Sequence, residues 1–302
     1  VLEGQATGRS LMFCGHMDTV GVEGMESPFA PAVRSGRLYG RGSQDMKGGV
    51  AAMIDAARLT AERGLSRGRL IVAAVVDEEF ASIGADALVK EWAADGAVVT
   101  EPTDLQVGVG HKGFAWIDIE THGRAAHGSR PRDGRDAIMR MGRVLRQLET
   151  LDRELQARSP HPLMGSGSLH ASIVSGGREL SSYPDRCRLQ IERRTIGAES
   201  GEAALQEVLG ILDGLSREDA EFEASAVLAF SRPPYELSSD HELPRQLVEA
   251  MQSLGRGPAA VGMSFWTDAA VLGAAGIPTV LFGPGGAGLH SREEYVTTDD
   301  VV

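Results

Sequence analysis

The chain has 302 residues, enough for one large or two medium domains. Its formal net charge of -12 argues against a nucleic-acid-binding surface. Hydrophobic residues make up 42% and charged residues 24%, as in ordinary globular proteins, and no run of about 18 apolar residues predicts a membrane-spanning helix.

Short apolar runs alternate with a helical pattern in the first hundred residues, which favours an α/β fold with a mixed, mostly parallel sheet flanked by helices. An alanine-rich helix is predicted over 46–64, and Gly64 is its expected C-terminal stop. The predicted strands are rich in Val, Ile and Leu, as in a sheet covered on both faces. They span residues 10–15, 69–76, 96–100 and 278–283.

The middle of the chain follows a different pattern, because residues 114–120 alternate apolar and polar side chains like a strand with one solvated face. Further helices are predicted near 134–156 and 200–215, and further strands near 168–175, 186–195 and 221–230. This β-α-β-β-α-β order predicts an inserted α+β domain. We expect the insertion to cover 111–231 and to divide a discontinuous domain of residues 1–110 and 232–302.

Two glycine-containing motifs resemble functional motifs but lack their context. The segment "GVGHKG" (108–113) has the spacing of a dinucleotide-binding loop, but a strand rather than a helix is expected after it. The segment "GLSRG" around Ser66 runs from helix to strand, whereas a nucleophile elbow runs from strand to helix. We therefore assign neither motif a function.

Two cysteines, Cys14 and Cys187, cannot form a disulfide framework, which favours a reducing cytoplasm. No secretory signal is recognised at the start of the chain. Residue 1 leads almost directly into a core strand, and "TTDDVV" stops where a helix is expected to start. We therefore expect additional elements beyond both ends.

Acidic residues or histidines follow every predicted strand of the α/β sheet. Ligands of such sheets gather beyond the carboxyl ends of the strands, so these side chains are expected at one edge. One further acid, Asp45, directly precedes the long predicted helix. The residues after the four strands are, in chain order, His16 with Asp18, then Asp77 with Glu78 and Glu79, then Glu101, and finally His290.

The charges of these residues suggest a metal centre. Asp45, Glu79 and Glu101 packed in one cleft would repel each other unless cations neutralised them. A carboxylate-bridged pair of divalent ions would do so. Imidazole with carboxylate ligands suits zinc best, and cobalt or manganese are also compatible.

Spacing suggests partners for two of the candidates. His16 and Asp18 are two residues apart, so they face the same way in an extended segment, and a carboxylate beside a ligating imidazole fixes its tautomer. Glu78 and Glu79 are adjacent and would point apart. One of them could bind metal while the other takes a proton from a metal-bound water, and spacing alone does not say which.

Five segments occur in order along nearly the whole chain: "GHMDTV", "GRGSQDMKGGVAAM", "VVDEE", "EPTDL" and "GPGGAGLHSREEYV". Together they resemble the co-catalytic zinc amidohydrolases, which include acetylornithine deacetylase, succinyl-diaminopimelate desuccinylase and glutamate carboxypeptidase. The resemblance implies a catalytic α/β domain, an inserted α+β lid that usually forms a homodimer, and two zinc ions.

The resemblance also implies a role for each candidate. Glu78 would act as general base and then as general acid, and Asp18 would orient His16. One zinc would be held by His16, Asp45 and Glu101, and the other by Asp45, which bridges, with Glu79 and His290.

Two lid segments resemble functional segments of the same family. In "GRAAHGSRP" the histidine is His127, which would reach a neighbouring subunit's active site and stabilise the oxyanion. In "PDRCRLQIERR" the spacing from Pro184 selects Arg194 to grip a substrate carboxylate, for which a planar guanidinium is suited. Many relatives have asparagine before this segment, where the chain has "SSY", so Ser181 would make a shorter contact.

The expected activity is hydrolysis of the amide bond of a small N-acyl amino acid. A metal-bridging hydroxide would attack the carbonyl carbon, and Glu78 would carry its proton to the leaving amine. Relatives with glutamate at the position of Glu101 tend to be deacylases or carboxypeptidases. The alternatives are a di- or tripeptidase or a glutamate-carboxypeptidase-type exopeptidase, or else a catalytically silent metal-binding homologue.

Overall fold

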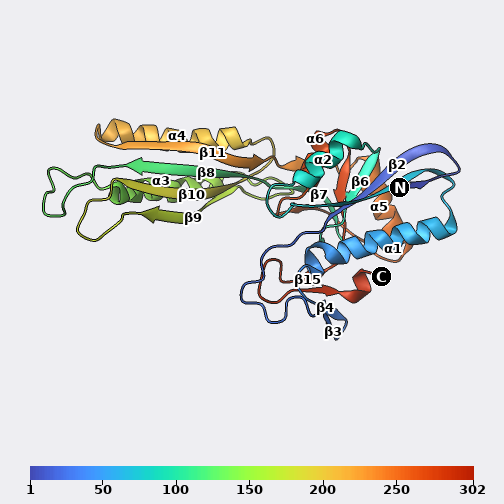
Figure 1. Cartoon of the computed structure of the whole chain (residues 1–302). Coiled ribbons are helices and arrows are strands. Elements are labelled where there is room, and N and C mark those ends of the chain that lie inside the picture. Colours follow the sequence, from blue (N-terminus) through green and yellow to red (C-terminus); the bar gives the residue numbers. More distant parts are fainter. The chain divides into compact units, whose positions relative to one another are not determined.

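The computed structural model describes residues 1–302, which form two compact units (Figure 1). We call the first the α/β unit; it comprises Val1–His111, Tyr235–Met263 and Thr267–Val302. The second, the α+β unit, comprises Lys112–Pro234 and Ser264–Trp266. None of the helices combines the length and the apolar character needed to cross a membrane.

The α/β unit is built on an eight-stranded sheet whose central strands β5, β2, β6 and β14 are parallel. Strands β1, β12 and β7 pair antiparallel with their neighbours, while β13 pairs parallel with β7. The sheet is therefore mixed and mostly parallel, and the predicted fold class is confirmed. In spatial order the strands are β1 (Leu2–Glu3), β5 (Arg67–Val75), β2 (Ala6–His16), β6 (Gly96–Val99), β14 (Thr279–Leu281), β7 (Val107–His111) and β12 (Tyr235–Glu236), with β13 (Ala260–Met263) beside β7.

Helices cover both faces of this sheet, as its apolar strands require. Side chains alternate along β2, so Leu11 and Phe13 face helices α1 (Gly48–Arg63) and α5 (Glu242–Ser253). The intervening Met12 and Cys14 are fully buried in the core beneath α2 (Ile83–Glu91) and α6 (Ala269–Ala274). Figure 1 shows α1 on one side of the sheet and α2 with α6 on the other.

Helix α1 begins later than predicted. It starts at Gly48 rather than at residue 46 and ends at Arg63, where Gly64 follows with a φ of 77°. A separate turn, η1 (Ser43–Lys47), precedes it, and Asp45 within the turn has non-helical dihedrals. The backbone N–H of Asp45 donates to the carboxylate of Glu294, so a side chain rather than the helix ladder fixes this turn.

A small antiparallel sheet connects two distant parts of the chain. Its strands β4 and β16 pair directly, which brings the segment before η1 beside the C-terminal segment. A last turn, η2 (Thr298–Asp300), follows. The strand order is β15 (Gly286–Ala287), β16 (Tyr295–Thr297), β4 (Arg37–Tyr39) and β3 (Ala32–Arg34).

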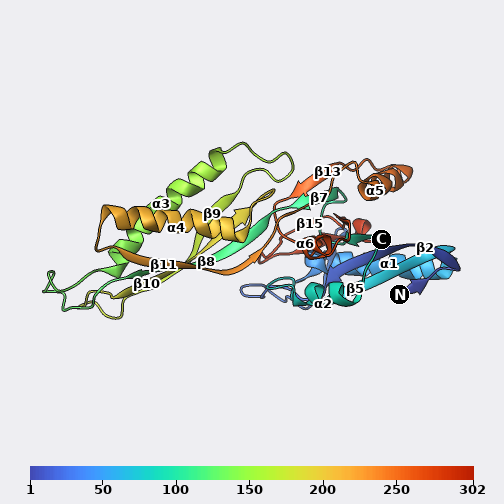
Figure 2. The ribbon, with the colours of Figure 1, turned by 90° about the horizontal axis from the view of Figure 1, so that it is seen from above.

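The α+β unit has the predicted β-α-β-β-α-β order. Its antiparallel sheet has the spatial order β11-β8-β10-β9. Helices α3 and α4 both pack on one face, as Figure 2 shows, and enclose a core of Leu, Ile and Val side chains. The elements are β8 (Gly113–His122), α3 (Ala137–Ala157), β9 (Ser168–Gly176), β10 (Arg186–Thr195), α4 (Gly201–Glu218) and β11 (Glu223–Arg232).

Candidate metal centre

The side chains predicted at the strand ends lie together in the α/β unit. The last residue of β2 is His16, the loop after β5 contributes Glu78 and Glu79, and Glu101 follows β6. Parallel strands present their carboxyl ends at one edge, which explains why distant residues converge there. Turn η1 adds Asp45 and the loop after β15 adds His290.

The carboxylate of Asp45 lies between two imidazoles. Its Oδ1 is 3.1 Å from Nε2 of His16, and its Oδ2 is 3.3 Å from Nε2 of His290. The same nitrogen of His290 is 3.0 Å from Oε2 of Glu79. Each oxygen of Asp45 therefore faces a different histidine.

The two adjacent glutamates face different halves of the cluster. Glu79 contacts His290, whereas Oε2 of Glu78 lies 3.8 Å from Nε2 of His16. Oε1 of Glu101 lies 3.9 Å from the same nitrogen. Ligand atoms of His16, Asp45 and Glu79 lie within 4.8 Å of one another, as do those of His16, Glu78 and Glu101.

Asp18 contacts His16 mainly through its backbone. Nδ1 of His16 is 3.1 Å from the carbonyl oxygen of Asp18 and 3.7 Å from its carboxylate. The carboxylate instead accepts the backbone N–H groups of Glu78 and Glu79 at 3.4 and 3.2 Å. Asp18 thus fixes the ring of one candidate ligand and the loop that carries both glutamates.

Burial and crowding favour the protonated forms of two carboxyl groups in the cluster. Burial, followed by the charges of Asp268 and Asp45, raises the pKa of Glu78 well above its ordinary value. Burial, followed by the charge of Glu78, does the same to the pKa of Glu101. A nearby cation would stabilise the charged form of these carboxylates.

The two histidines have correspondingly high affinity for protons. Hydrogen bonds to Asp45 and Glu79 raise the pKa of His290 to about 10. Burial lowers the pKa of His16, but the hydrogen bond to Asp45 together with the charges of Asp45, Glu79 and Asp18 outweighs it, so the net shift is upward. Burial also raises the pKa of Asp45, and its bonds to both imidazoles more than reverse this, so Asp45 stays charged.

These residues fit a site for divalent metal. The donor set consists of imidazole nitrogens and carboxylate oxygens, the ligands that zinc prefers together. Burial and neighbouring carboxylates raise the pKa values of Glu78 and Glu101, and a bound cation would offset this by stabilising their charged forms. The positive charge that the histidines would otherwise take up as protons can be supplied by metal instead.

The sequence profile of peptidase family M20/M25/M40 matches residues 12–302. The chain belongs to this family. It is a hydrolase that acts on amide or peptide bonds, and membership of this metallopeptidase family implies binding of divalent metal.

Curated relatives of this M20 chain include two enzymes that remove acyl groups. Acetylornithine deacetylase of Myxococcus xanthus is 32% identical over 99% of this chain and 78% of its own length. N-formyl-4-amino-5-aminomethyl-2-methylpyrimidine deformylase of Bacillus subtilis (strain 168) is 28% identical over 97% of this chain and 76% of its own.

Solved structures share the M20 fold. A tripeptidase of Staphylococcus aureus has a TM-score of 0.81 at 21% identity, covering 99% of this chain and 79% of that one. An M20 metallo-carboxypeptidase of Sulfolobus solfataricus has a TM-score of 0.75 at 17% identity, covering 99% of this chain and 83% of that one. At these identities the likeness shows the fold.

One acidic residue near this M20 cluster was not predicted. Asp268 lies at the start of α6, is 2% exposed, and its charge contributes to the raised pKa values of Glu78 and Glu101. The sequence signal was an aspartate before a short apolar segment, "WTDAAVL". Asp268 does not follow a predicted strand, so the pattern of acids at strand ends does not predict it.

The lid candidates of this M20 chain lie in the α+β unit. His127 is exposed, its Nδ1 accepts the backbone N–H of Ser129 at 3.1 Å, and Nε2 is thereby left as the protonated nitrogen of the neutral ring. Ser181 lies beside it, because its carbonyl oxygen accepts the N–H of Gly128 at 2.7 Å.

Arg194 lies at the other end of the same sheet. It pairs with Phe114 near the start of β8, whereas His127 follows the end of that strand. Its Nε is 2.7 Å from Glu192, and its guanidinium lies 5.6 Å from the centre of the Phe114 ring. The adjacent Arg193 points to the opposite face, where it is 2% exposed and paired with Glu199 and Glu207 of the same unit.

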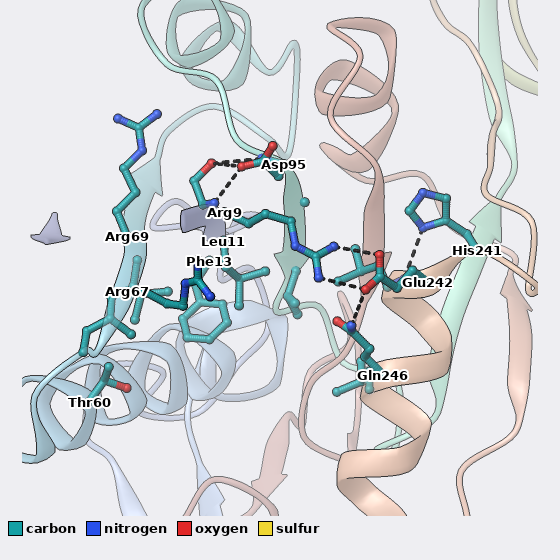
Figure 3. A pocket seen from close by; sticks show the side chains of 17 residues that line it. Arg9, Leu11, Phe13, Thr60, Arg67, Arg69, Asp95, His241, Glu242 and Gln246 are labelled. Atoms are coloured by element: carbon teal, nitrogen blue, oxygen red, sulfur yellow. Dashed lines mark hydrogen bonds and ion pairs between the residues drawn. The ribbon is translucent and has the colours of Figure 1, made fainter. Parts of the chain in front are cut away.

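Away from the metal-ligand candidates, a hollow of about 520 Å³ lies between α1, α5 and the sheet, as Figure 3 shows. Several polar side chains that line it are hydrogen-bonded to one another. Arg9 donates two hydrogen bonds to Glu242, and Asp95 accepts hydrogen bonds from Ser10. Its histidine, His241, accepts the N–H of Leu243 at the start of α5. These groups stabilise structure, and none of the candidate metal ligands lines this hollow.

Proposed function

We propose that this M20 hydrolase is a di-metal deacylase of small N-acyl amino acids. The observation that carries the proposal is the position of Asp45, whose two carboxylate oxygens face His16 and His290 separately at 3.1 and 3.3 Å. A carboxylate placed in this way can bridge two cations. The proposal assigns His16 and Glu101 to one ion and Glu79 and His290 to the other.

Zinc is the proposed metal because imidazole and carboxylate ligands suit it, and cobalt or manganese could substitute. Such a pair of ions, when bound, acts as a Lewis acid that lowers the pKa of a water and polarises a carbonyl group.

Glu78 is the proposed general base and acid. Its side chain is only 9% exposed, and burial together with the neighbouring carboxylates raises its pKa. A carboxyl group with a raised pKa can take a proton from the attacking water and return it to the leaving amine. Glu79 is less suited, since its carboxylate already holds His290 at 3.0 Å.

The nature of the relatives supports deacylation over peptide hydrolysis. The acetylornithine deacetylase that is 32% identical and the deformylase that is 28% identical both carry names of acyl-removing enzymes. The peptidases among the solved structures are 14–21% identical and so speak to the fold alone.

The lid residues support a homodimer in which His127 serves a neighbouring copy. From Phe114, beside Arg194, to His122 the strand β8 extends about 26 Å at 3.3 Å per residue, and His127 lies beyond. A small N-acyl amino acid cannot contact Arg194 and the His127 of one chain at that separation. We propose that His127 donates its Nε2–H to the oxyanion in the partner's site.

Strand β9 supports the same assembly. It lies at the sheet edge, pairs only with β10, and most of its side chains are exposed, including Ile173 and Val174. An unpaired edge of this kind is available to another copy of the chain. Arg194 and Ser181 are the proposed contacts of the substrate carboxylate, and Arg194 would exchange its partner Glu192 for the substrate.

The test is hydrolysis by protein first stripped of metal and then loaded with zinc, cobalt or manganese. N-acetylornithine, N-succinyl-diaminopimelate and dipeptides are compared by kcat/KM. We expect an N-acyl amino acid to be the best substrate and the metal-free protein to be inactive. Preference for dipeptides would replace the deacylase proposal by a peptidase, and no hydrolysis across the panel would overturn the enzymatic proposal.

A further inference from the structure

We infer that the buried ion pair between Arg41 and Glu294 is a positioning pair that fixes the turn carrying Asp45 against the segment after His16 and the loop carrying His290. The inference rests on the proposed function and adds two residues to it. Neither residue belongs to the proposed ligand set.

The carboxylate of Glu294 organises the turn that carries Asp45. Its Oε1 accepts the backbone N–H groups of Gln44 and Asp45 at 2.9 and 3.1 Å. Its Oε2 accepts the N–H of Gly42 at 3.0 Å and the guanidinium of Arg41 at 2.6 Å. Each oxygen therefore has two donors, and no free lone pair is left for a metal ion.

The guanidinium of Arg41 extends the same network to the other loops. Its Nε donates to the carbonyl of Gly21, in the segment that follows His16 and Asp18. Its Nη2 donates to the carbonyl of Ser291, the residue after His290, at 2.9 Å. One side chain thus joins the loops on both sides of the bridging aspartate.

The burial of this pair excludes direct contact with substrate. The side chains of Arg41 and Glu294 are 4% and 0% exposed. A buried carboxylate without a partner is costly, and here a guanidinium and three backbone N–H groups compensate it completely. The pair therefore acts through the backbone of Asp45 and the loop of His290.

The backbone dihedral angles of the loops indicate that they need stabilising contacts of the kind that Arg41 and Glu294 provide. His290 has a φ of 58°, a left-handed value that is uncommon for residues other than glycine and that surrounding contacts stabilise. Asp45 departs from helical dihedrals in a turn that leads into α1. Without Glu294 the N–H groups of the turn would lose their acceptors, and Asp45 would lose its orientation between the two imidazoles.

The experiment compares metal binding by wild type, Glu294→Gln and the double variant Arg41→Met/Glu294→Gln. A glutamine amide turns a donor towards the N–H and guanidinium donors that Glu294 now accepts. The matched control is Glu207→Gln, which weakens the ion pair to the buried Arg193 in the α+β unit and touches no ligand loop. The readouts are competitive chelator titration, the visible spectrum of the cobalt-loaded protein, and thermal unfolding without metal.

We expect Glu294→Gln to weaken metal binding about tenfold to a hundredfold and to alter the cobalt spectrum, since residues that orient ligands typically have effects of that size. The double variant should still bind metal weakly, because removing the unpaired charge of Arg41 does not restore the carboxylate oxygens that accept the N–H groups of the turn. Arg41→Lys keeps the charge and loses donors to Gly21 and Ser291; it should be intermediate, and it provides the test if Glu294→Gln does not fold.

Three results would overturn the inference. If both Glu294→Gln and Arg41→Lys bind metal as tightly as Glu207→Gln does, the pair has no positioning role. If the double variant recovers wild-type affinity and spectrum, the pair serves only charge balance. If the wild type itself takes up no metal, the proposed function fails together with this inference.

Discussion

Two neighbouring residues with the same side chain have different surroundings in this protein. Glu79 holds His290 at 3.0 Å, whereas Glu78 is buried beside His16 and Glu101 with a raised pKa. Side chains at adjacent positions of a turn point in different directions. Two glutamates can therefore have different roles, one as a metal ligand and the other as a proton carrier. The difference comes from the neighbours that each side chain faces, because their exposed fractions are nearly equal, at 9% and 10%.

The assignment of Glu78 predicts that Glu78→Ala loses turnover and keeps metal. General acid–base catalysis contributes about a hundredfold to ten-thousandfold, so kcat should fall by at least that range. Glu79→Ala should instead lose metal, because it removes a partner of His290. Metal content per chain and kcat are measured for both variants. Loss of metal in Glu78→Ala with retention in Glu79→Ala would show that the two roles are reversed.

The pKa shifts predict that metal binding releases protons. Without metal, the pKa of His290 is about 10 and those of His16, Glu78 and Glu101 are raised, so these groups hold protons near neutral pH more than usual. Metal requires deprotonated ligands, so affinity should rise as the pH is raised from 6 towards about 10. Asp45 does not contribute to the proton release, because its lowered pKa leaves it charged before metal binds.

Calorimetry in buffers of different ionisation enthalpy measures the protons released in this titration. Net release should be positive at pH 7 and diminish towards pH 10. An affinity that does not depend on pH, with no proton release, would contradict the pKa shifts.

The residues that could be predicted from sequence are those that follow apolar strands. His16, Glu79 and Glu101 stand within three residues of an apolar run, so the sheet edge on which they meet follows from the pattern. Glu294 and Asp268 could not be predicted in the same way. Their importance lies in backbone N–H groups and charges contributed by segments far away in the chain, which no local pattern records.

At the scale of elements, prediction succeeded where the sequence pattern is long or strongly apolar. The strands and helices of the inserted domain were predicted within a few residues, because alternation in 114–120 and helical periodicity near 134–156 are unambiguous. Helices α2 and α5 and the small sheet were not predicted. Helix α2 has nine residues and the strands of the small sheet have two or three, too few to establish a period.

Two glycine-to-alanine substitutions, one in the tightly packed helix α1 and one at an open position of α4, should have opposite effects on stability. A Cβ on Gly49 would overlap the carbonyl oxygen of Thr100, next to Glu101, so Gly49→Ala should destabilise the α/β unit by about 1–3 kcal/mol. Gly210 lies in α4 with open space around it, so Gly210→Ala should stabilise the α+β unit by about 0.5–1 kcal/mol.

Hydrogen exchange of core amides reads the stability of each unit separately, in β2 for the first substitution and in β10 for the second. Equal tolerance of alanine at both positions would mean that α1 can shift away from Thr100, and that this contact does not fix the start of the helix beside Glu101.

At the scale of the whole molecule, the proposed catalytic groups are divided between the two units. The metal ligands and Glu78 belong to the α/β unit, while His127 and Arg194 belong to opposite ends of the α+β sheet. A single chain therefore supplies its own ligands and, in the proposed dimer, lends its His127 to another copy. This division makes a prediction that a monomeric enzyme cannot satisfy.

Mixing two inactive variants should restore activity. His127→Ala and Glu78→Ala homodimers each lack one group in both sites. In a mixed dimer, the site of the His127→Ala chain has its own Glu78 and receives the partner's His127, so one site is complete. Random exchange makes half the dimers mixed, so activity should recover to about a quarter of wild type. If His127 instead acts within its own chain, every site in the mixture lacks a group, and activity stays at the level of the separate variants after exchange has been verified by mass spectrometry.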